Sequence, residues 1–228
     1  MIAAPADTWI FAYGSLMWSP GFRFVEARRA RLNGYHRAFC VYSIHYRGTE
    51  RRPGLVLGLD RGGVCEGMAF RIAPELAAET LAYLRRRELI YGVYREVLAP
   101  VDLGPTASEP ARGVRAVAYI AERAHPAYAG CLPLQREAAL IRRSAGRGGT
   151  NLDYLLNTLS HLEELGIAEP RLRRIAALSG ALIARRLAGL EAGGRSPTVA
   201  LARAWAGRPI ATPRTVRDNR FGYRARRG

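Results

Sequence analysis

The chain contains no lysine, so all 35 basic residues among its 228 residues are arginines. With 19 acidic residues the formal net charge is +16, which ordinarily suggests nucleic acid or an acidic membrane surface as a partner. The arginines are spread along the whole chain, however, and the missing lysine indicates a general compositional bias. We therefore expect no dedicated nucleic-acid role. The densest non-helical group of arginines, residues 208–227, keeps an anion- or RNA-binding protein as the alternative from another class.

Cysteine is scarce as well: the three cysteines are odd in number, widely spaced and outside any CxxC or Cys/His cluster. This pattern supports neither a disulfide framework nor a zinc site. The N-terminal residues lack the basic and apolar segments of a signal peptide, and the most apolar late stretch, residues 176–184, is too short to span a bilayer. We expect a cytoplasmic protein with reduced cysteines and no membrane contact.

Several catalytic motifs are missing. Residues 145–151, AGRGGTN, lack the Lys-Ser/Thr pair of a P-loop, and no GxGxxG or GxSxG sequence is present. Ser15 has no base close by in the sequence, so we interpret it as a turn serine. None of the four histidines has the spacing of metal ligands. We therefore expect neither a metal nor a cofactor.

Hydrophobic residues make up 49% of the chain, enough for one sizeable core. Runs of β-branched and aromatic residues between turn signals predict strands at residues 9–13, 38–46, 54–60, 64–72, 94–103 and 114–121. Helical patterns and caps predict helices at residues 74–88, 134–145, 152–166 and 170–190. Short strands interleaved with a few helices predict an α+β fold, a small barrel or strongly curved sheet flanked by helices.

The helix from Pro74 carries an unusual carboxylate. Ala77, Leu81 and Leu84 form its apolar stripe, and the next step along that stripe is Glu88. Burial and the negative end of the helix dipole both raise the pKa of a carboxyl group, which suits proton transfer near neutral pH. The arginines at 85–87 would lower that pKa only if they faced the same way, and consecutive helical residues diverge. A helix-terminal salt bridge to one of these arginines is the alternative.

Six segments, in consistent order over residues 9–180, resemble those of the ChaC-type γ-glutamylcyclotransferases. They are YGSLMW (13–18), GYHRAFC (34–40), HYRGTERRPGLVLGL (45–59), YLRRRE (83–88), YAGCLPL (128–134) and GRGGTNLDYLLNTLSHLEELGI (146–167). The resemblance implies a compact mixed β-barrel with flanking helices. It also implies an enzyme that cleaves the γ-glutamyl bond of glutathione to give 5-oxoproline and cysteinylglycine.

The resemblance assigns roles to individual residues. It implies that Glu88 is the acid/base and that the turn after the first strand holds the γ-glutamyl group. The later active-site tyrosine falls on Tyr94, with Tyr91 as the alternative. Cys131 stands where many relatives have proline, which leaves Tyr128 matched but the shape of its loop open. The residues expected to bind substrate are Tyr13, Gly14, Ser15, Leu16, Met17, Trp18, Arg37, Tyr94 and Tyr128.

This chemistry explains the missing motifs, because the substrate's own α-amine attacks its γ-carbonyl and no catalytic serine, cysteine or metal is needed. We expect the backbone amides of residues 14–16 to hold either the substrate α-carboxylate or the oxyanion. Arg37 either pairs with a substrate carboxylate or forms a structural pair under the barrel. Tyr13 and Trp18 would line a pocket for a small polar ligand, which accounts for an aromatic, glycine-containing turn after an apolar strand.

Two regions are expected. Residues 1–190 form the γ-glutamylcyclotransferase domain, and residues 191–228 form an Arg-rich, flexible C-terminal extension. The expected partner is a small molecule, glutathione or another γ-glutamyl amine or peptide.

Overall fold

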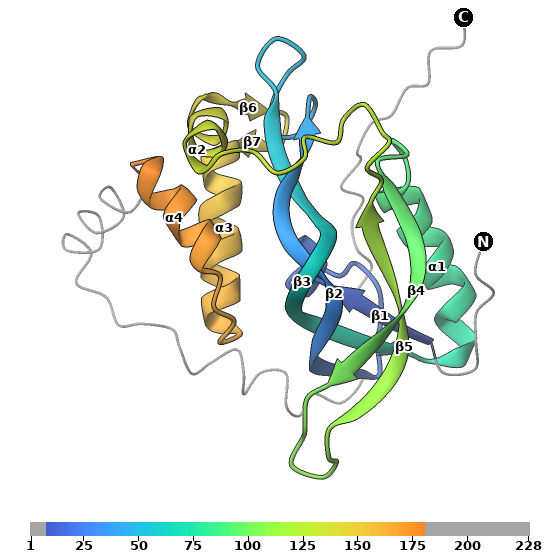
Figure 1. Ribbon diagram of the computed structural model, residues 1–228. Helices are drawn as coiled ribbons and strands as arrows, with labels where there is room; N and C mark the ends of the chain where they lie inside the picture. The colour runs from blue at the N-terminus through green and yellow to red at the C-terminus, as the bar shows by residue number, and fades with distance from the viewer. Residues whose placement is uncertain (1–7, 181–228) are drawn as a thin grey trace, which may run out of the picture. The chain divides into compact units, whose positions relative to one another are not determined.

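The computed structural model describes residues 8–180 of the protein, and within them five strands close into a barrel (Figure 1). Around the barrel the strand order is β1-β3-β2-β4-β5. β1 pairs in parallel with β5, whereas the β1–β3, β2–β3, β2–β4 and β4–β5 pairs are antiparallel. The strands are β1 (Thr8–Ala12), β2 (Glu26–Ser43), β3 (Gly54–Ile72), β4 (Tyr94–Leu103) and β5 (Arg112–Ala121). The predicted α+β fold with a small mixed barrel is confirmed.

Helices flank the barrel. Figure 1 shows α1 (Pro74–Glu88) on one side, whereas α2 (Leu134–Arg143), α3 (Asn151–Glu164) and α4 (Pro170–Leu178) gather on the other. A 3-10 turn, η1 (Ser15–Met17), follows β1, and the short strands β6 (Ala145–Gly146) and β7 (Gly149–Thr150) form a hairpin before α3. None of the helices in residues 8–180 has the length and apolar character needed to cross a membrane.

Helix α1 has the predicted bounds and the predicted buried face. Proline occupies its first turn, where the missing N–H leaves no hydrogen bond unmade. Ala77, Leu81 and Leu84 are buried in the main core, and each buried leucine contributes about 2 kcal/mol to folding. This packing fixes α1 against the barrel and thereby determines where its last residue, Glu88, lies.

The long strands β2 and β3 differ from the prediction. The turn expected at residues 60–63 is wrong, because β3 continues through it. Gly62 and Gly63 have φ angles of 95° and 71° and lie opposite Gly34, with φ 82°. The glycines that were expected to form a turn instead form an irregularity in the β2–β3 ladder. Backbone pairing resumes on both sides of it and holds one strand of 19 residues.

The first half of β2 was missed because its outward positions are arginines and one inward position is also an arginine. Arg28 is buried, and its Nη1 donates to Glu109 Oε2 at 2.7 Å. A buried guanidinium is tolerated when it is paired and hydrogen-bonded in this way. The predicted strand at 38–46 is also too long at its end, since β2 stops at Ser43.

The helices on the other side follow the predicted caps, with two corrections. The Thr150 hydroxyl accepts a hydrogen bond from the Asp153 N–H at 3.0 Å, and Gly166, with φ 66°, ends α3. Helix α2 stops at Arg143, because the next residues enter β6. Helix α4 ends at Leu178 and Gly180 has φ 76°, so the predicted helix does not continue through residues 179–180. The rest of that prediction and the expected extension at 191–228 lie outside the described residues.

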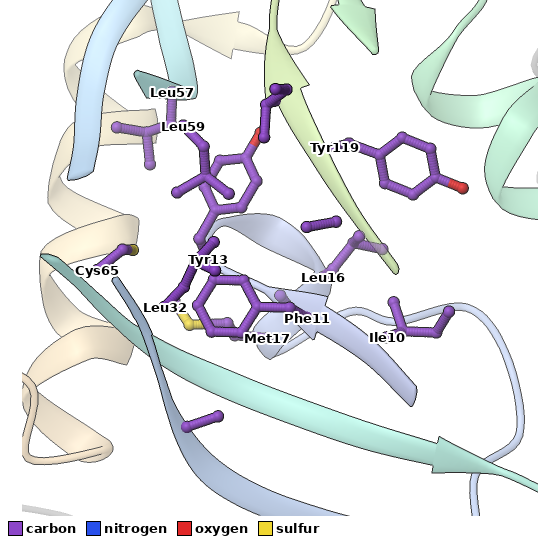
Figure 2. Packing of buried hydrophobic residues seen from close by; sticks show 14 of the residues in the cluster. Ile10, Phe11, Tyr13, Leu16, Met17, Leu32, Leu57, Leu59, Cys65 and Tyr119 are labelled. Atoms are coloured by element: carbon purple, nitrogen blue, oxygen red, sulfur yellow. The ribbon is translucent and has the colours of Figure 1, made fainter. Parts of the chain in front are cut away.

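The barrel interior is apolar, and the segment after β1 enters it. β1 is buried along its whole length, as are Tyr13, Leu16 and Met17. Figure 2 shows part of this core, in which Tyr13 lies among apolar residues of β2 and β3. Cys40 and Cys65 are buried and Cys131 is exposed, and all three are unpaired.

Candidate active site

The turn after β1 contains backbone N–H groups that have no acceptor among the described residues. The Met17 N–H donates to the Gly14 carbonyl at 2.8 Å, which closes η1. None of the hydrogen bonds among the described residues uses the N–H of Gly14, Ser15 or Leu16 as its donor. A Cβ atom placed on Gly14 would meet Leu57 Cδ1 at 3.9 Å, an ordinary contact, so packing alone does not require glycine there. The three amides are therefore available to a bound anion.

Glu88 lies at the C-terminal end of α1 with its side chain only 18% exposed. Burial raises the pKa of this carboxyl group, and the charge of Arg87 opposes the rise. The predicted direction of the pKa shift is confirmed. The predicted divergence of the neighbouring arginines is wrong for Arg87, whose Nε lies 3.1 Å from Glu88 Oε1.

Arg87 also reaches the turn, which the sequence did not indicate. Its Nη2 donates to Ser15 Oγ at 3.0 Å, and its Nη1 donates to the Ser19 carbonyl at 3.1 Å and to the Tyr83 hydroxyl at 3.1 Å. One guanidinium therefore connects the Glu88 carboxylate with the segment that follows β1. The salt bridge considered as the alternative to a functional Glu88 exists, and it ties Glu88 to the turn.

The charge of Glu88 acts on four tyrosines that come from separate elements. Burial is the main cause of the raised pKa of each phenol, and the negative charge of Glu88 is a further cause in all four. These tyrosines come from the segment after β1, from β4, from β5 and from α3: Tyr13, Tyr94, Tyr119 and Tyr154. Two of them, Tyr13 and Tyr94, were expected at the site.

Of the two tyrosines after Glu88, the geometry favours Tyr94. Its hydroxyl donates to the Leu57 carbonyl at 2.7 Å, on the strand that also faces Gly14. Tyr91 is 37% exposed, and its ring stacks on His45 with a centroid distance of 5.5 Å.

Tyr154 was not identified as a site residue. It lies on α3 one turn after Asn151, which anchors that helix to β3 through hydrogen bonds with the Leu55 N–H and carbonyl at 2.6 and 2.7 Å. Burial raises the Tyr154 pKa to about 12, and hydrogen bonding from the Leu57 backbone and the charge of Arg47 oppose the rise. The segment was recognised, but a tyrosine on the inner face of an amphipathic helix looks like an ordinary core residue.

Tyr128 packs, as Tyr94 does, against the buried cluster that contains Cys40. Its hydroxyl donates to Asp60 Oδ2 at 2.8 Å, and Arg123 Nε donates to Asp60 Oδ1 at the same distance. Burial, followed by this hydrogen bond, raises the Tyr128 pKa to about 12. Glu88 is not among the charges that shift it. The structure thus gives the Tyr128 hydroxyl a partner outside the group of tyrosines around Glu88.

Arg37 binds the backbone at the start of the turn after β1. Its side chain is fully buried, its Nε donates to the Tyr13 carbonyl at 2.5 Å and its Nη2 to the Glu66 carbonyl at 2.5 Å. Its Nη1 forms an ion pair with Glu169. These contacts match the structural alternative for Arg37. At the other end of the turn, the Trp18 ring stacks on His161 at 4.6 Å.

A metal site is not formed by the part of the chain that the structure describes: no three His, Cys, Asp or Glu residues there are grouped to hold an ion. The arrangement around Glu88 instead offers one buried carboxyl group, one guanidinium, four phenols and a set of backbone amides. These groups can bind a small substrate with an anionic end and transfer protons.

Comparison with known proteins agrees with this arrangement. Residues 8–179 match the family model described as ChaC-like protein. The glutathione-specific gamma-glutamylcyclotransferase of Escherichia coli (strain K12) is 38% identical over 161 residues, which cover 71% of this chain and 68% of that protein. The glutathione-specific gamma-glutamylcyclotransferase 1 of Homo sapiens is 34% identical over 167 residues, covering 71% of this chain and 72% of that protein.

The fold is shared with a solved structure, that of the yeast gamma-glutamyl cyclotransferase specific to glutathione. Its TM-score is 0.67 at 22% identity, and the match covers 78% of this chain and 96% of that one. The family model covers most of the chain, and relatives above 30% identity span over two thirds of their own length. The chain therefore belongs to the ChaC-like protein family.

Proposed function

We propose that this protein is a γ-glutamylcyclotransferase that converts glutathione to 5-oxoproline and cysteinylglycine. The observation that carries the proposal is the buried Glu88 carboxyl group, with its raised pKa, linked through Arg87 to a turn whose amides lack protein acceptors among the described residues. The names of the relatives support glutathione as the substrate.

The bond-forming step is intramolecular. The α-amine of the γ-glutamyl group attacks its own γ-carbonyl, the five-membered lactam closes, and the bond to the cysteinyl nitrogen breaks. The two reacting groups already belong to one molecule, so the site contributes by holding the chain curled with the amine against the carbonyl. The site therefore needs groups that bind and orient both ends of the γ-glutamyl moiety.

Glu88 transfers the proton. An α-amine has a pKa of about 8 and is mostly ammonium near neutral pH, so a base must remove a proton before attack. The Glu88 carboxylate takes that proton and returns it to the departing cysteinyl nitrogen. Burial, which raises the Glu88 pKa, makes the group a better base, and contact with Arg87 holds it beside the turn.

The amides of Gly14, Ser15 and Leu16 hold either the substrate α-carboxylate or the oxyanion that forms at the γ-carbonyl. Tyr94 and Tyr154 supply hydroxyl groups near Glu88. In this scheme Arg37 is a positioning residue, because it binds the Tyr13 carbonyl at the start of the turn.

We also propose that residues 1–190 form the catalytic domain and that the protein acts in the cytoplasm. The family match ends at residue 179, and the candidate site residues all precede it. Three unpaired cysteines support a reducing compartment.

The test is an assay of purified protein with glutathione and no added metal, in which 5-oxoproline and cysteinylglycine are both measured. We expect equal amounts of the two products, and a loss of at least ~100-fold in kcat for Glu88→Gln. Glu79→Gln, at an exposed position of the same helix, is the matched control and should retain full activity. Release of free glutamate in place of 5-oxoproline would mean hydrolysis and would overturn the mechanism.

A further inference from the structure

Arg47 lies in the loop between β2 and β3, and only one of the three nitrogens of its guanidinium group donates hydrogen bonds to the described residues. Its Nη1 donates to the carbonyl oxygens of Gly148 and Thr150, the latter at 3.3 Å. Within residues 8–180 neither its Nε nor its Nη2 has a hydrogen-bond acceptor, and no carboxylate oxygen lies within 4.0 Å of the group. Arg47 is intermediate in exposure, and the hydrogen bonds of its guanidinium group are open to solvent. The Nε and Nη2 donors can therefore be reached by an anionic ligand.

The guanidinium group is held in place before any ligand arrives. The Arg47 N–H donates to Ser43 Oγ at 3.0 Å. The β6–β7 hairpin binds the same loop, because the Gly148 N–H donates to the Tyr46 carbonyl at 2.9 Å. Arg47 Cζ also lies 5.1 Å from the centroid of the Tyr154 ring, a cation–π contact. The loop therefore presents the Nε–Nη2 edge of Arg47 in a fixed position, and this edge is the one that matches a carboxylate in a bidentate pair.

The Arg47 loop borders the candidate active site at two places. On one side Arg47 lies over Tyr154, which comes from α3 beside β3 and is shifted in pKa by both Arg47 and Glu88. On the other side His45 stacks on Tyr91, three residues after Glu88. A substrate whose γ-glutamyl end lies between the turn and Glu88 would extend its other end toward this loop.

We propose that Arg47 binds the carboxylate at the far end of the leaving group, which in glutathione is the glycine carboxylate, and so determines which γ-glutamyl substrates are accepted. This inference rests on the proposed cyclotransferase function. γ-Glutamyl amines whose leaving group carries no carboxylate leave the Arg47 edge unpaired and react poorly. Arg47 thus forms a specificity subsite that is separate from the proton-transfer group.

The test compares glutathione with glutathione amidated at its glycine carboxylate, using wild type, Arg47→Gln and Arg51→Gln. Arg51 lies in the same loop with an exposed side chain and serves as the control. Wild type and Arg51→Gln should prefer glutathione over the amide by about 10–100-fold in kcat/KM, as expected for a charged hydrogen bond. Arg47→Gln should lose that preference, with kcat/KM for glutathione falling to the value for the amide, and a far-UV circular dichroism spectrum and Tm like those of wild type show that the variant folds. Equal wild-type rates on the two substrates, or an unchanged preference in Arg47→Gln, would overturn the inference.

A binding measurement separates this inference from the proposed reaction. Calorimetry with Glu88→Gln protein needs no turnover and gives Kd for glutathione and for the amide. In Glu88→Gln protein we expect the Kd of the amide to be at least about tenfold higher than that of glutathione. In the Glu88→Gln/Arg47→Gln double variant the two Kd values should be equal. This result supports the Arg47 subsite even if no 5-oxoproline forms in the activity assay. Identical Kd values for the two ligands would refute the Arg47 subsite. They would not bear on the cyclotransferase reaction, which the activity assay tests separately.

Discussion

Two opposed electrostatic effects act on the Glu88 carboxyl group. Its burial at the end of α1 favours the neutral form, and its contact with Arg87 favours the charged form. Burial is the larger effect, so the pKa is raised. A group balanced in this way can accept a proton from an ammonium and return it, which a fully exposed or fully paired carboxylate would do less well.

This balance predicts a pH-dependent difference in stability between wild type and Glu88→Gln. Because the folded pKa of Glu88 is above its ordinary value of 4.5, the fold favours the protonated form. That contribution is fully present below the unfolded pKa and is lost as the pH rises through the folded pKa. Glutamine does not ionise, so the Tm of the variant minus the Tm of wild type should increase as the pH rises from about 4 to about 8. Calorimetric melts at intermediate pH values measure this difference.

Glu79→Gln is the control in the same melts, since Glu79 is exposed on the same helix. A Tm difference for Glu88→Gln that is constant, or that decreases with pH, would show that the pairing with Arg87 outweighs burial.

The sequence identified part of the site residue by residue. Glu88 was predicted because a carboxylate continued a buried stripe, a signal that helical periodicity carries. Arg87 was missed because the periodicity gives only the direction of a side chain from the helix axis. A long guanidinium bends back, and here it reaches both Glu88 and Ser15. Contacts made by flexible ends of side chains depend on the assembled fold and cannot be derived from spacing.

At the scale of elements, one network joins α1 to the barrel close to Glu88. Arg85 donates to both carboxylate oxygens of Glu96 on β4, through Nε and Nη2, each at 2.8 Å. The Tyr119 hydroxyl on β5 donates to Glu96 Oε2 at 3.2 Å. Because Arg85 is one turn before Glu88, this bidentate pair fixes the last turn of the helix against β4 and β5.

We predict that Glu96→Gln lowers the free energy of unfolding by about 3 kcal/mol, because it leaves a guanidinium without its charged partner next to a carboxyl position that is 8% exposed. We also expect kcat to fall about tenfold with KM nearly unchanged, since a 1 Å misplacement of a catalytic group can cost more than that. Urea unfolding and steady-state kinetics measure the two effects.

The control for Glu96→Gln is Glu122→Gln, which disrupts an exposed ion pair with Arg95 at 3.5 Å and should cost under about 1 kcal/mol. If Glu96→Gln were destabilised as expected but kept the wild-type kcat, the network would hold the fold without positioning Glu88.

Elements with complete local signals were predicted well, and elements defined by pairing were not. Helix α1 and strand β4 have the expected bounds. Their ends are marked by local features, a proline in the first turn or a sharp change of hydrophobic period, which can be recognised from neighbouring residues alone. β3 was divided at Gly62 and Gly63, which do adopt the positive φ angles of a turn. The continuous ladder with β2 overrides that local preference, and ladder hydrogen bonds are nonlocal interactions.

Across the described part of the chain, the site is assembled from distant segments. Helices α1 and α3 lie on different sides of the barrel (Figure 1), and they supply Glu88 and Tyr154 to the same group of residues. The turn after β1 and the start of β4 supply Tyr13 and Tyr94. The resemblance to a known family located these segments in order along the chain. Their convergence around one carboxyl group follows from the closure of the barrel.

The distribution of charge gives the last prediction. Residues 191–228 contain nine arginines and two acidic residues, so they contribute +7 of the net charge of +16. The candidate site and the family match, residues 8–179, lie entirely outside this region. A variant ending at residue 190 should therefore keep kcat/KM for glutathione within about twofold of the full chain at low and moderate salt, because the family match and every candidate site residue lie within residues 8–179. Measurements of the rate at several salt concentrations test this.

The same truncated variant separates the enzyme from the basic binding protein considered as its rival. An RNA- or anion-binding protein would lose affinity steeply with salt, and would lose binding altogether on removal of residues 191–228. Gel-shift titrations of full-length and truncated protein with a nonspecific RNA therefore accompany the kinetic assay. We expect the truncated protein to turn over glutathione normally. An inactive truncation whose full-length parent binds RNA tightly would instead make the Arg-rich region the functional part of the chain.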